Sequence, residues 1–300
     1  MSEQFRRAWR AQVGSLVVAD SSAGRNGELD ISFKVKRTLA MRAGTLEMEV
    51  FNLNQEHRHE LAALPRRRTF VSLDVGYVGD GNSSRLFTGD LRKAVVARDG
   101  VDFVVKITAG DGEHARRTAR VSRAFASGTA LADVARHLAE SMGVGIGNAV
   151  EALRGARFAS GASGFDGGTV IRGTAGDELT RLCETAQLSW SIQDDCLQLI
   201  PLGGSLGRTA ILLSPTTGMI DSPEIVDRRT ITVKALIQPG LVPGQSVVVD
   251  SAVVSGVWRI TEAEVSGKTD GTDWYCTMTC TRPRAALTGA TVAGARAEIP

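Results

Sequence analysis

The chain has 300 residues, and its 35 lysines and arginines nearly balance its 33 aspartates and glutamates, which leaves a formal net charge of +2. This balance argues against a dedicated nucleic-acid-binding protein, which would carry a basic excess on one face. No apolar run approaches the roughly 18 residues of a membrane-spanning helix, and no signal peptide is visible. We therefore expect a protein that is made and first folded in a cytoplasm.

Composition favours a strand-rich protein of about two domains. Hydrophobic residues make up 43% of the chain, whereas aromatic residues make up only 5%. The core must therefore consist mainly of Val, Ile, Leu and Ala. Many of the 33 glycines lie between short apolar alternations, which is typical of turns between strands.

Residues 1–112 read as strands and turns. Leu29, Ile31, Phe33 and Val35 alternate with polar and charged residues, the pattern of a strand with one buried face. Similar alternation predicts further strands at 14–19, 45–51, 69–77, 86–96 and 101–109, with a short helix or ordered loop at 56–64. About six strands at this spacing suggest a closed or sandwich-like β-domain.

Residues 113–203 differ in character and predict a small α+β unit. Thr129 is a candidate N-cap and Gly143 a stop for a helix with apolar residues at a 3.6-residue period, namely Leu131, Val134, Ala135, Leu138 and Met142. A second helix follows Thr174, which with Asp177 resembles a capping box. Two alternating segments, 188–192 and 196–200, then predict a hairpin that turns at 193–195.

Residues 204–300 return to strands, expected at 211–214, 231–235, 247–254, 258–265 and 274–281, and the tail from Ala285 is expected to fray. We predict a mainly β fold in which two β-barrel or sandwich domains, 1–112 and 204–300, flank a helical bridge at 113–203. The β-domain is thus used twice, although no tandem repeat is present.

No candidate catalytic group has the spacing of an active site. The chain has four histidines, namely His57, His59, His114 and His137. His57 and His59 lie in a charged stretch that favours a solvated loop over a metal site, and His137 is expected to be exposed. Glu47 and Glu49 share one strand face, an arrangement that resembles a glycosidase carboxylate pair, but such a polar strand face is common. We therefore predict no catalytic, metal or cofactor site, and no enzyme.

Two glycine-rich segments also favour a structural interpretation. Residues 143–148 (GVGIGN) follow a helix instead of preceding one, so they predict a helix stop rather than a phosphate cradle. Residues 110–113 (GDGE) lack the ligand spacing of a calcium loop and predict a turn.

The four cysteines are expected to be reduced and to include core residues. Cys276 and Cys280 lie four apart on a predicted strand, so about 13 Å separates them, too far for one metal ion. Buried thiols are the better interpretation for this pair, and Cys183 and Cys196 are also expected to be reduced.

A cluster of arginines, Arg116, Arg117, Arg120 and Arg123, leaves two alternatives open. If the segment is extended, the last two lie on opposite faces, and if it is helical, Arg116, Arg120 and Arg123 share one face. The cluster is then either a solvated positive surface or a contact with a partner subunit or a phosphate backbone.

Several segments together carry a family resemblance: TLEMEVFNLN (45–54), LFTGDL (86–91), IQDDCLQLIPL (192–202), LSPTTGMIDSPE (213–224) and WRITE (258–262) ahead of DWY (273–275). The chain resembles, over nearly its whole length, the baseplate hub proteins of tailed bacteriophages, the late-control-D-like group. The 213–224 segment is the most distinctive part.

The resemblance implies a non-enzymatic subunit of the phage virion, assembled in the host cytoplasm. Two tail-tube-like β-domains per chain would give a homotrimer with a pseudo-sixfold ring. This ring would adapt the sixfold tail tube to a threefold spike and leave a channel through which DNA passes without specific binding. Expected partners are the tail tube protein, the spike protein and the tape measure protein.

Three alternatives remain. The first is a tail-tube or distal-tail protein that forms a true hexamer. The second is a cell-wall glycan-binding module built on the middle α+β unit, in which exposed Trp190 or Trp258 would stack on sugar. Both tryptophans alternate in phase with apolar neighbours, however, which predicts core positions. The third, a hydrolase, lacks a convergent set of His, Asp and Glu.

Overall fold

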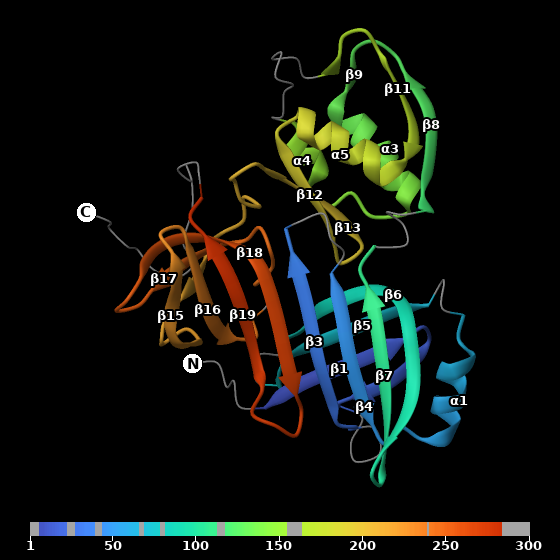
Figure 1. Cartoon of the computed structure of the whole chain (residues 1–300), viewed down its shortest axis with the longest axis vertical. Helices are drawn as coiled ribbons and strands as arrows, with labels where there is room; N and C mark the ends of the chain where they lie inside the picture. Colours follow the sequence, from blue (N-terminus) through green and yellow to red (C-terminus); the bar gives the residue numbers. More distant parts are fainter. Residues whose placement is uncertain are drawn as a thin grey trace.

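The computed structural model describes residues 6–22, 28–39, 44–65, 69–78, 82–112, 118–154, 164–238 and 240–283. A large, mostly antiparallel sheet occupies one end of the molecule, and a smaller α+β unit stands above it (Figure 1). The prediction of a mainly β chain with a small α+β unit is confirmed. The predicted tail from Ala285 lies outside the described residues.

The large sheet is built from the first and last segments of the chain. The first segment provides β1 (Arg7–Val13), β2 (Leu16–Asp20), β3 (Ile31–Thr38), β4 (Thr45–Phe51), α1 (Gln55–Ala63), β5 (Phe70–Tyr77), β6 (Asn82–Asp99) and β7 (Asp102–Gly110). The last provides β14 (Ile211–Leu213), β15 (Met219–Asp227), β16 (Thr230–Leu236), β17 (Ser246–Asp250), β18 (Ser255–Lys268) and β19 (Trp274–Thr281).

In its described residues, the α+β unit between them, here called the middle unit, has three small two-stranded sheets and the three helices α3, α4 and α5. Its elements are β8 (Arg120–Phe125), β9 (Thr129–Ala130), α3 (Leu131–Met142), α4 (Ala149–Arg154), β10 (Gly164–Phe165), β11 (Thr169–Thr174), α5 (Ala175–Thr185), β12 (Leu188–Gln193) and β13 (Cys196–Pro201). The strands pair as β8 with β11, β9 with β10 and β12 with β13.

The two strand-rich segments form one continuous sheet. Its 13 strands include the path β15-β16-β19-β18-β3-β4-β7-β6-β5-β1-β2, with β17 beside β18 and β14 beside β17. The join lies where residues 32–38 of β3 pair with residues 262–268 of β18. On its outer face, Glu264 accepts from Lys34 at 2.6 Å and from Lys36 at 3.3 Å. The predicted division of this sheet into two separate barrels or sandwiches stays a prediction.

Alternation decides which side chains enter the core. Val35, Leu46 and Ile107 point inward and are almost completely buried, and one apolar cluster runs from β1 to β19. The middle unit has a second cluster, built around α3, α5 and the β12–β13 hairpin. The two clusters do not share residues, so the molecule has two cores.

The helix ends of the middle unit correct two predictions. Thr129 lies in β9, and its hydroxyl donates to the carbonyl of Ala126, so α3 begins after Ala130 without a side-chain cap. The Thr174 side chain does not cap α5 either, because its hydroxyl accepts from Arg120 at 3.2 Å. At the other end of α3, Gly143 takes the predicted left-handed conformation, with a φ of 71°.

Gly267 on β18 allows two aromatic rings to meet across the sheet. Phe33 on β3 and Trp274 on β19 flank it in register, and their rings pack edge to face with centroids 5.4 Å apart. A Cβ at position 267 would overlap the Phe33 ring and approach Trp274 Cε3 to 2.9 Å. The two rings can therefore pack against each other only because position 267 has no side chain.

We predict that Gly267→Ala lowers the free energy of unfolding by about 1–3 kcal/mol, because the rings must shift from their packed positions. Gly271→Ala is the control, since a Cβ there would meet only the flexible Lys268 side chain. Chemical denaturation measures both variants. Equal stability of the two would show that the rings tolerate the methyl group.

Candidate interaction surfaces

The histidines proposed from the sequence do not converge. His57 and His59 lie on α1, which agrees with the helix alternative for 56–64 and corrects the solvated loop favoured for the two histidines. The helix begins at the Asn54 cap, whose side chain accepts from the His57 amide at 2.7 Å. His137 is half-buried instead of exposed, because its ring packs on the Phe125 ring, with 5.8 Å between the two ring centroids. His114 lies outside the described residues.

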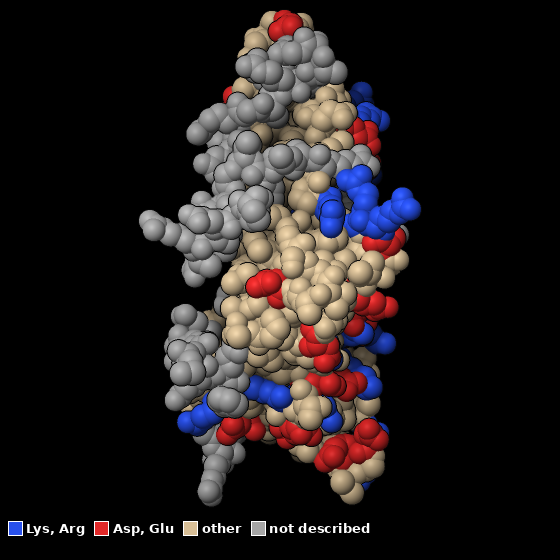
Figure 2. Space-filling view, turned by 90° about the vertical axis from the view of Figure 1, so that its left-hand side faces the viewer, with Lys and Arg blue, Asp and Glu red and all other residues tan. Residues whose placement is uncertain are grey.

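The paired glutamates belong to a charged outer sheet face. Glu49 contacts Lys106 at 2.8 Å and accepts from the Ser32 hydroxyl at 3.3 Å, while Glu47 is exposed. Acidic and basic residues lie intermixed over the lower part of the molecule in Figure 2. This arrangement agrees with the interpretation of an ordinary polar strand face.

Each glycine-rich segment makes a turn that contacts the β12–β13 hairpin. After Gly143 stops α3, the Gly145 amide donates to the carbonyl of Asp195 at 2.8 Å, and the Gly145 carbonyl accepts from Leu197 at 2.7 Å. In the other turn, Asp111 is buried and accepts backbone hydrogen bonds from the hairpin. The Gly143 segment is the helix stop that the sequence predicts.

All four cysteines are free. Cys183, Cys276 and Cys280 are buried, and burial raises the pKa of each thiol to about 12. The prediction of core thiols for the β19 pair is confirmed. Within the described part of the chain, no group of three His, Cys, Asp or Glu residues is placed to hold a metal ion.

The two tryptophans considered for sugar stacking lie in the cores. Trp190 is 2% exposed, and its indole N–H donates to the Thr180 hydroxyl at 3.2 Å. Trp258 is 3% exposed. Neither ring presents a face to solvent, so the prediction of core positions is confirmed for both.

The described part of the arginine cluster lies on an extended ribbon. Arg120 and Arg123 belong to β8, which agrees with the alternative of an extended segment. Arg120 donates to Thr174, and Arg123 Nη1 lies 2.9 Å from His137 Nδ1. Arg116 and Arg117 lie outside the described residues.

Three strands of the sheet have one described neighbour each, namely β15, β2 and the short β14, which pairs with β17. Among the described strands, β15 pairs only with β16, and β2 pairs only with β1. On β15, Ile225 is 56% exposed and Val226 is 59% exposed. The sequence did not mark these residues, because alternation cannot distinguish an edge strand from a central one.

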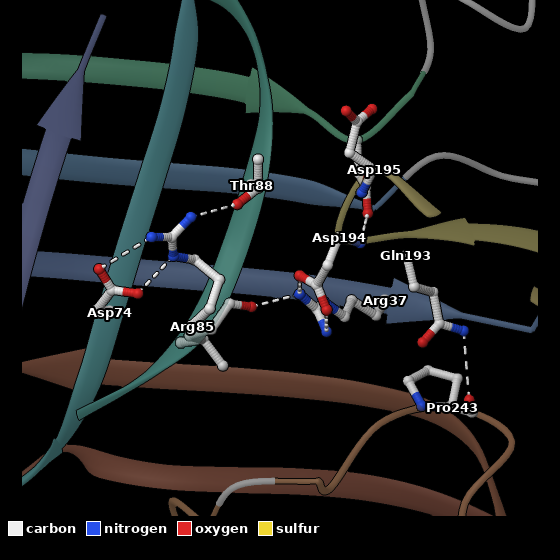
Figure 3. Close-up of polar contacts among 10 residues, drawn as sticks. Arg37, Asp74, Arg85, Thr88, Gln193, Asp194, Asp195 and Pro243 are labelled. Atoms are coloured by element: carbon white, nitrogen blue, oxygen red, sulfur yellow. Dashed lines mark hydrogen bonds and ion pairs between the residues drawn. The ribbon is translucent and has the colours of Figure 1, made fainter. Parts of the chain in front are cut away.

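A polar junction joins the middle unit to the large sheet (Figure 3). Arg37 of β3 is only 7% exposed and contacts Asp194 in the β12–β13 turn, while Asp111 follows β7. This junction is not predicted from the sequence. One signal was available, since Arg37 continues the alternation of Ile31, Phe33 and Val35 and therefore points into the core.

In the described parts of the chain, no helix is both long and apolar enough to cross a membrane. No family model matches the sequence, and no curated protein matches it. Solved structures, in contrast, resemble the fold.

The 43 kDa tail protein of prophage MuSo2 from Shewanella oneidensis superposes with a TM-score of 0.63 at 10% identity, over 92% of this chain and 97% of that one. A tail protein from Neisseria meningitidis MC58 gives a TM-score of 0.59 at 10% identity, over 93% and 97% of the two chains. The chain has the fold of these tail proteins. The E. coli c3393 protein, a type VI secretion component described as similar to T4 tail proteins gp27 and gp5, gives a TM-score of 0.50 at 10% identity, over 92% and 77%.

Proposed function

We propose that the chain is a structural hub subunit of a phage tail baseplate. The observation that carries this proposal is the fold shared with phage tail proteins over almost the full length of both chains. At this identity the likeness concerns the fold, so the role in the virion is an inference. The subunit would act as a homotrimer with the tail tube, spike and tape measure proteins as partners, and would leave a channel for DNA.

The ends of the large sheet support an assembly role. The outer edge of an unprotected strand offers a row of backbone donors and acceptors to another chain. The strands β15 and β2 lie at opposite ends of the strand path, so contact between the β15 end of one copy and the β2 end of the next would be head to tail. Such contacts form a closed ring when the rotation between copies divides the circle.

The proposal includes no enzymatic activity. In the described part of the chain, the candidate His and Glu residues lie apart, on α1, α3 and β4. A glycan-binding module is disfavoured because the tryptophans proposed for stacking are buried. A hexameric tail-tube or distal-tail protein is the remaining structural alternative, and the number of subunits distinguishes it.

Mass in solution combined with negative-stain images tests the proposal. With a chain mass of 31.8 kDa, we expect a species of three times that mass and a threefold ring with a central hole. A hexamer of the same shape would favour the tail-tube alternative. A monomer at all concentrations would overturn the assembly role.

The exposed residues of β15 give a sharper test. We predict that the double variant Ile225→Lys and Val226→Lys shifts the protein from trimer to monomer, because two ammonium groups oppose burial at a strand edge. The monomer should stay folded, with an unchanged circular dichroism spectrum, since both side chains are exposed in the single chain. Val253→Lys, at a site that is 55% exposed outside the strands, is the matched control. A double variant that stays trimeric would exclude β15 from the interface.

A further inference from the structure

The middle unit and the large sheet have separate apolar cores and meet around the β12–β13 hairpin. Each has its own core, and no described helix or strand of one packs extensively on the other. The β12–β13 hairpin lies between the helices and the sheet in Figure 1. The hairpin turn therefore has a large share in setting how the middle unit sits on the sheet.

Arg37 on β3 binds this turn through the Asp194 carboxylate. Its Nη1 donates to Asp194 Oδ2 at 3.3 Å, and its Nη2 contacts both Asp194 Oδ1 and the carbonyl of Leu86. Asp194 has a φ of 53°, and Asp195 has a φ of 60°. Left-handed conformation at both central residues is typical of a tight type I′ hairpin turn, which presents its backbone amides outward.

Asp111 holds the same turn from the end of β7. Its carboxylate accepts from the Asp194 amide at 2.9 Å and from the Asp195 amide at 3.2 Å, and the residue is 1% exposed. A third contact comes from Gln193, whose side-chain amide donates to the Pro243 carbonyl at 3.3 Å (Figure 3). Three segments next to one another in space therefore contact one turn: β3, the residue after β7 and the loop before β17.

We propose that the 193–195 turn, with Arg37 and Asp111, is a pH-sensitive latch that holds the middle unit on the large sheet at acidic pH and loosens as the pH rises. The contact is rich in acid groups. Four groups surround the Asp111 carboxyl group: Arg37 of β3, Asp194 and Asp195 of the turn, and the Cys196 thiol. Asp90 of β6 faces Asp195, and the Arg92 guanidinium lies against Gly110.

Burial of Asp111 sets the direction of the pH dependence. Desolvation raises the pKa of Asp111 from 3.8 to about 7, and it outweighs the opposing effects of Arg37 and of the two backbone amides. Burial and Asp90 also raise the pKa of Asp195. When the latch opens, water reaches Asp111 and its pKa falls toward the ordinary value. Closure therefore takes up a proton, so it is favoured at low pH, and this contribution is lost as the pH rises through about 7.

Electron paramagnetic resonance distances between spin labels test the latch. Labels at Ser122→Cys on β8 and Ser255→Cys on β18 report the position of the middle unit, since both sites are exposed. Cys196 is changed to serine, and the other three thiols are buried. Dilution with unlabelled chain isolates distances within one chain. We expect a narrow distribution at pH 5.5 and a broader one, with longer distances, at pH 8.5.

Charge variants separate the latch from general destabilisation. Arg37→Gln and Asp194→Asn should broaden the distribution even at pH 5.5, and asparagine tolerates the left-handed turn conformation. Arg85→Gln is the matched control, because Arg85 forms an arginine–aspartate pair with Asp74 inside the large sheet. Unchanged distances in both latch variants, or equal broadening in the Arg85 variant, would overturn the latch. Distances that broaden in the latch variants but ignore pH would overturn its pH dependence.

Discussion

Ile107→Asp is expected to unfold the large sheet as one unit and to leave the middle unit folded. Ile107 on β7 is 1% exposed and pairs with Met48 and Ala94 on the neighbouring strands. A carboxylate buried there has no cationic partner at its strand positions, so the cost should be at least about 4 kcal/mol. Because β3 pairs with β18 and one core runs through both segments, β16 and β19 should lose their protection together with β4.

Hydrogen exchange followed by mass spectrometry resolves the segments. The middle unit has its own core, so α3 and α5 should keep their slow exchange. Thr108→Asp is the control, since Thr108 points to the other face and lies between Lys93 on β6 and Glu47 on β4. If Ile107→Asp yields no folded protein, Ile107→Ala should give the same pattern at a cost of about 2–5 kcal/mol. Slow exchange that persists in β16 and β19 while β4 opens would favour two independent β-domains instead.

Trp190→Ala should lower the stability of the middle unit by about 3–5 kcal/mol. Trp190 on β12 directs its ring into the second core, against α5, and its removal leaves a cavity and takes away the hydrogen bond to the Thr180 hydroxyl. Trp190→Phe keeps most of the volume and should cost less, about 1–2 kcal/mol for the lost hydrogen bond and the smaller ring. The large sheet should exchange at its normal rate in both variants.

The same variants test the glycan-binding alternative. Val170→Ala is the control for the middle unit, because Val170 is 72% exposed and its loss should change stability by less than about 0.5 kcal/mol. Peptidoglycan pull-down and chemical denaturation are measured on each protein. A Trp190→Ala variant that keeps its stability but loses an affinity for peptidoglycan shown by the unmodified protein would contradict the core role and favour sugar stacking.

Local pattern was sufficient for most elements. The alternation of Ile31, Phe33 and Val35 predicts β3, and the 3.6-residue period of Leu131, Val134 and Leu138 predicts α3. Both patterns work because burial on one face repeats with the geometry of the backbone. The caps failed because Thr129 and Thr174 found other partners, which short-range rules cannot foresee.

The junction was out of reach for a different reason. Arg37 and Asp194 are separated by 157 positions, and neither position has a local signal for the other. An inward arginine in an alternating strand indicates that a buried partner exists, yet it does not identify that partner. The same applies to Asp111, whose partners are backbone amides that any turn could supply.

The sequence by itself determined the class of this protein: short strands with one apolar face, a helical insertion between two strand-rich segments, and cysteines and tryptophans suited to a core. Only the tertiary structure decided that β3 and β18 join the two strand-rich segments into one sheet and that β15 lies at its edge. The physical reason is that strand pairing uses backbone hydrogen bonds, which are the same for every residue except proline. Which strands meet is therefore decided by how the whole chain packs.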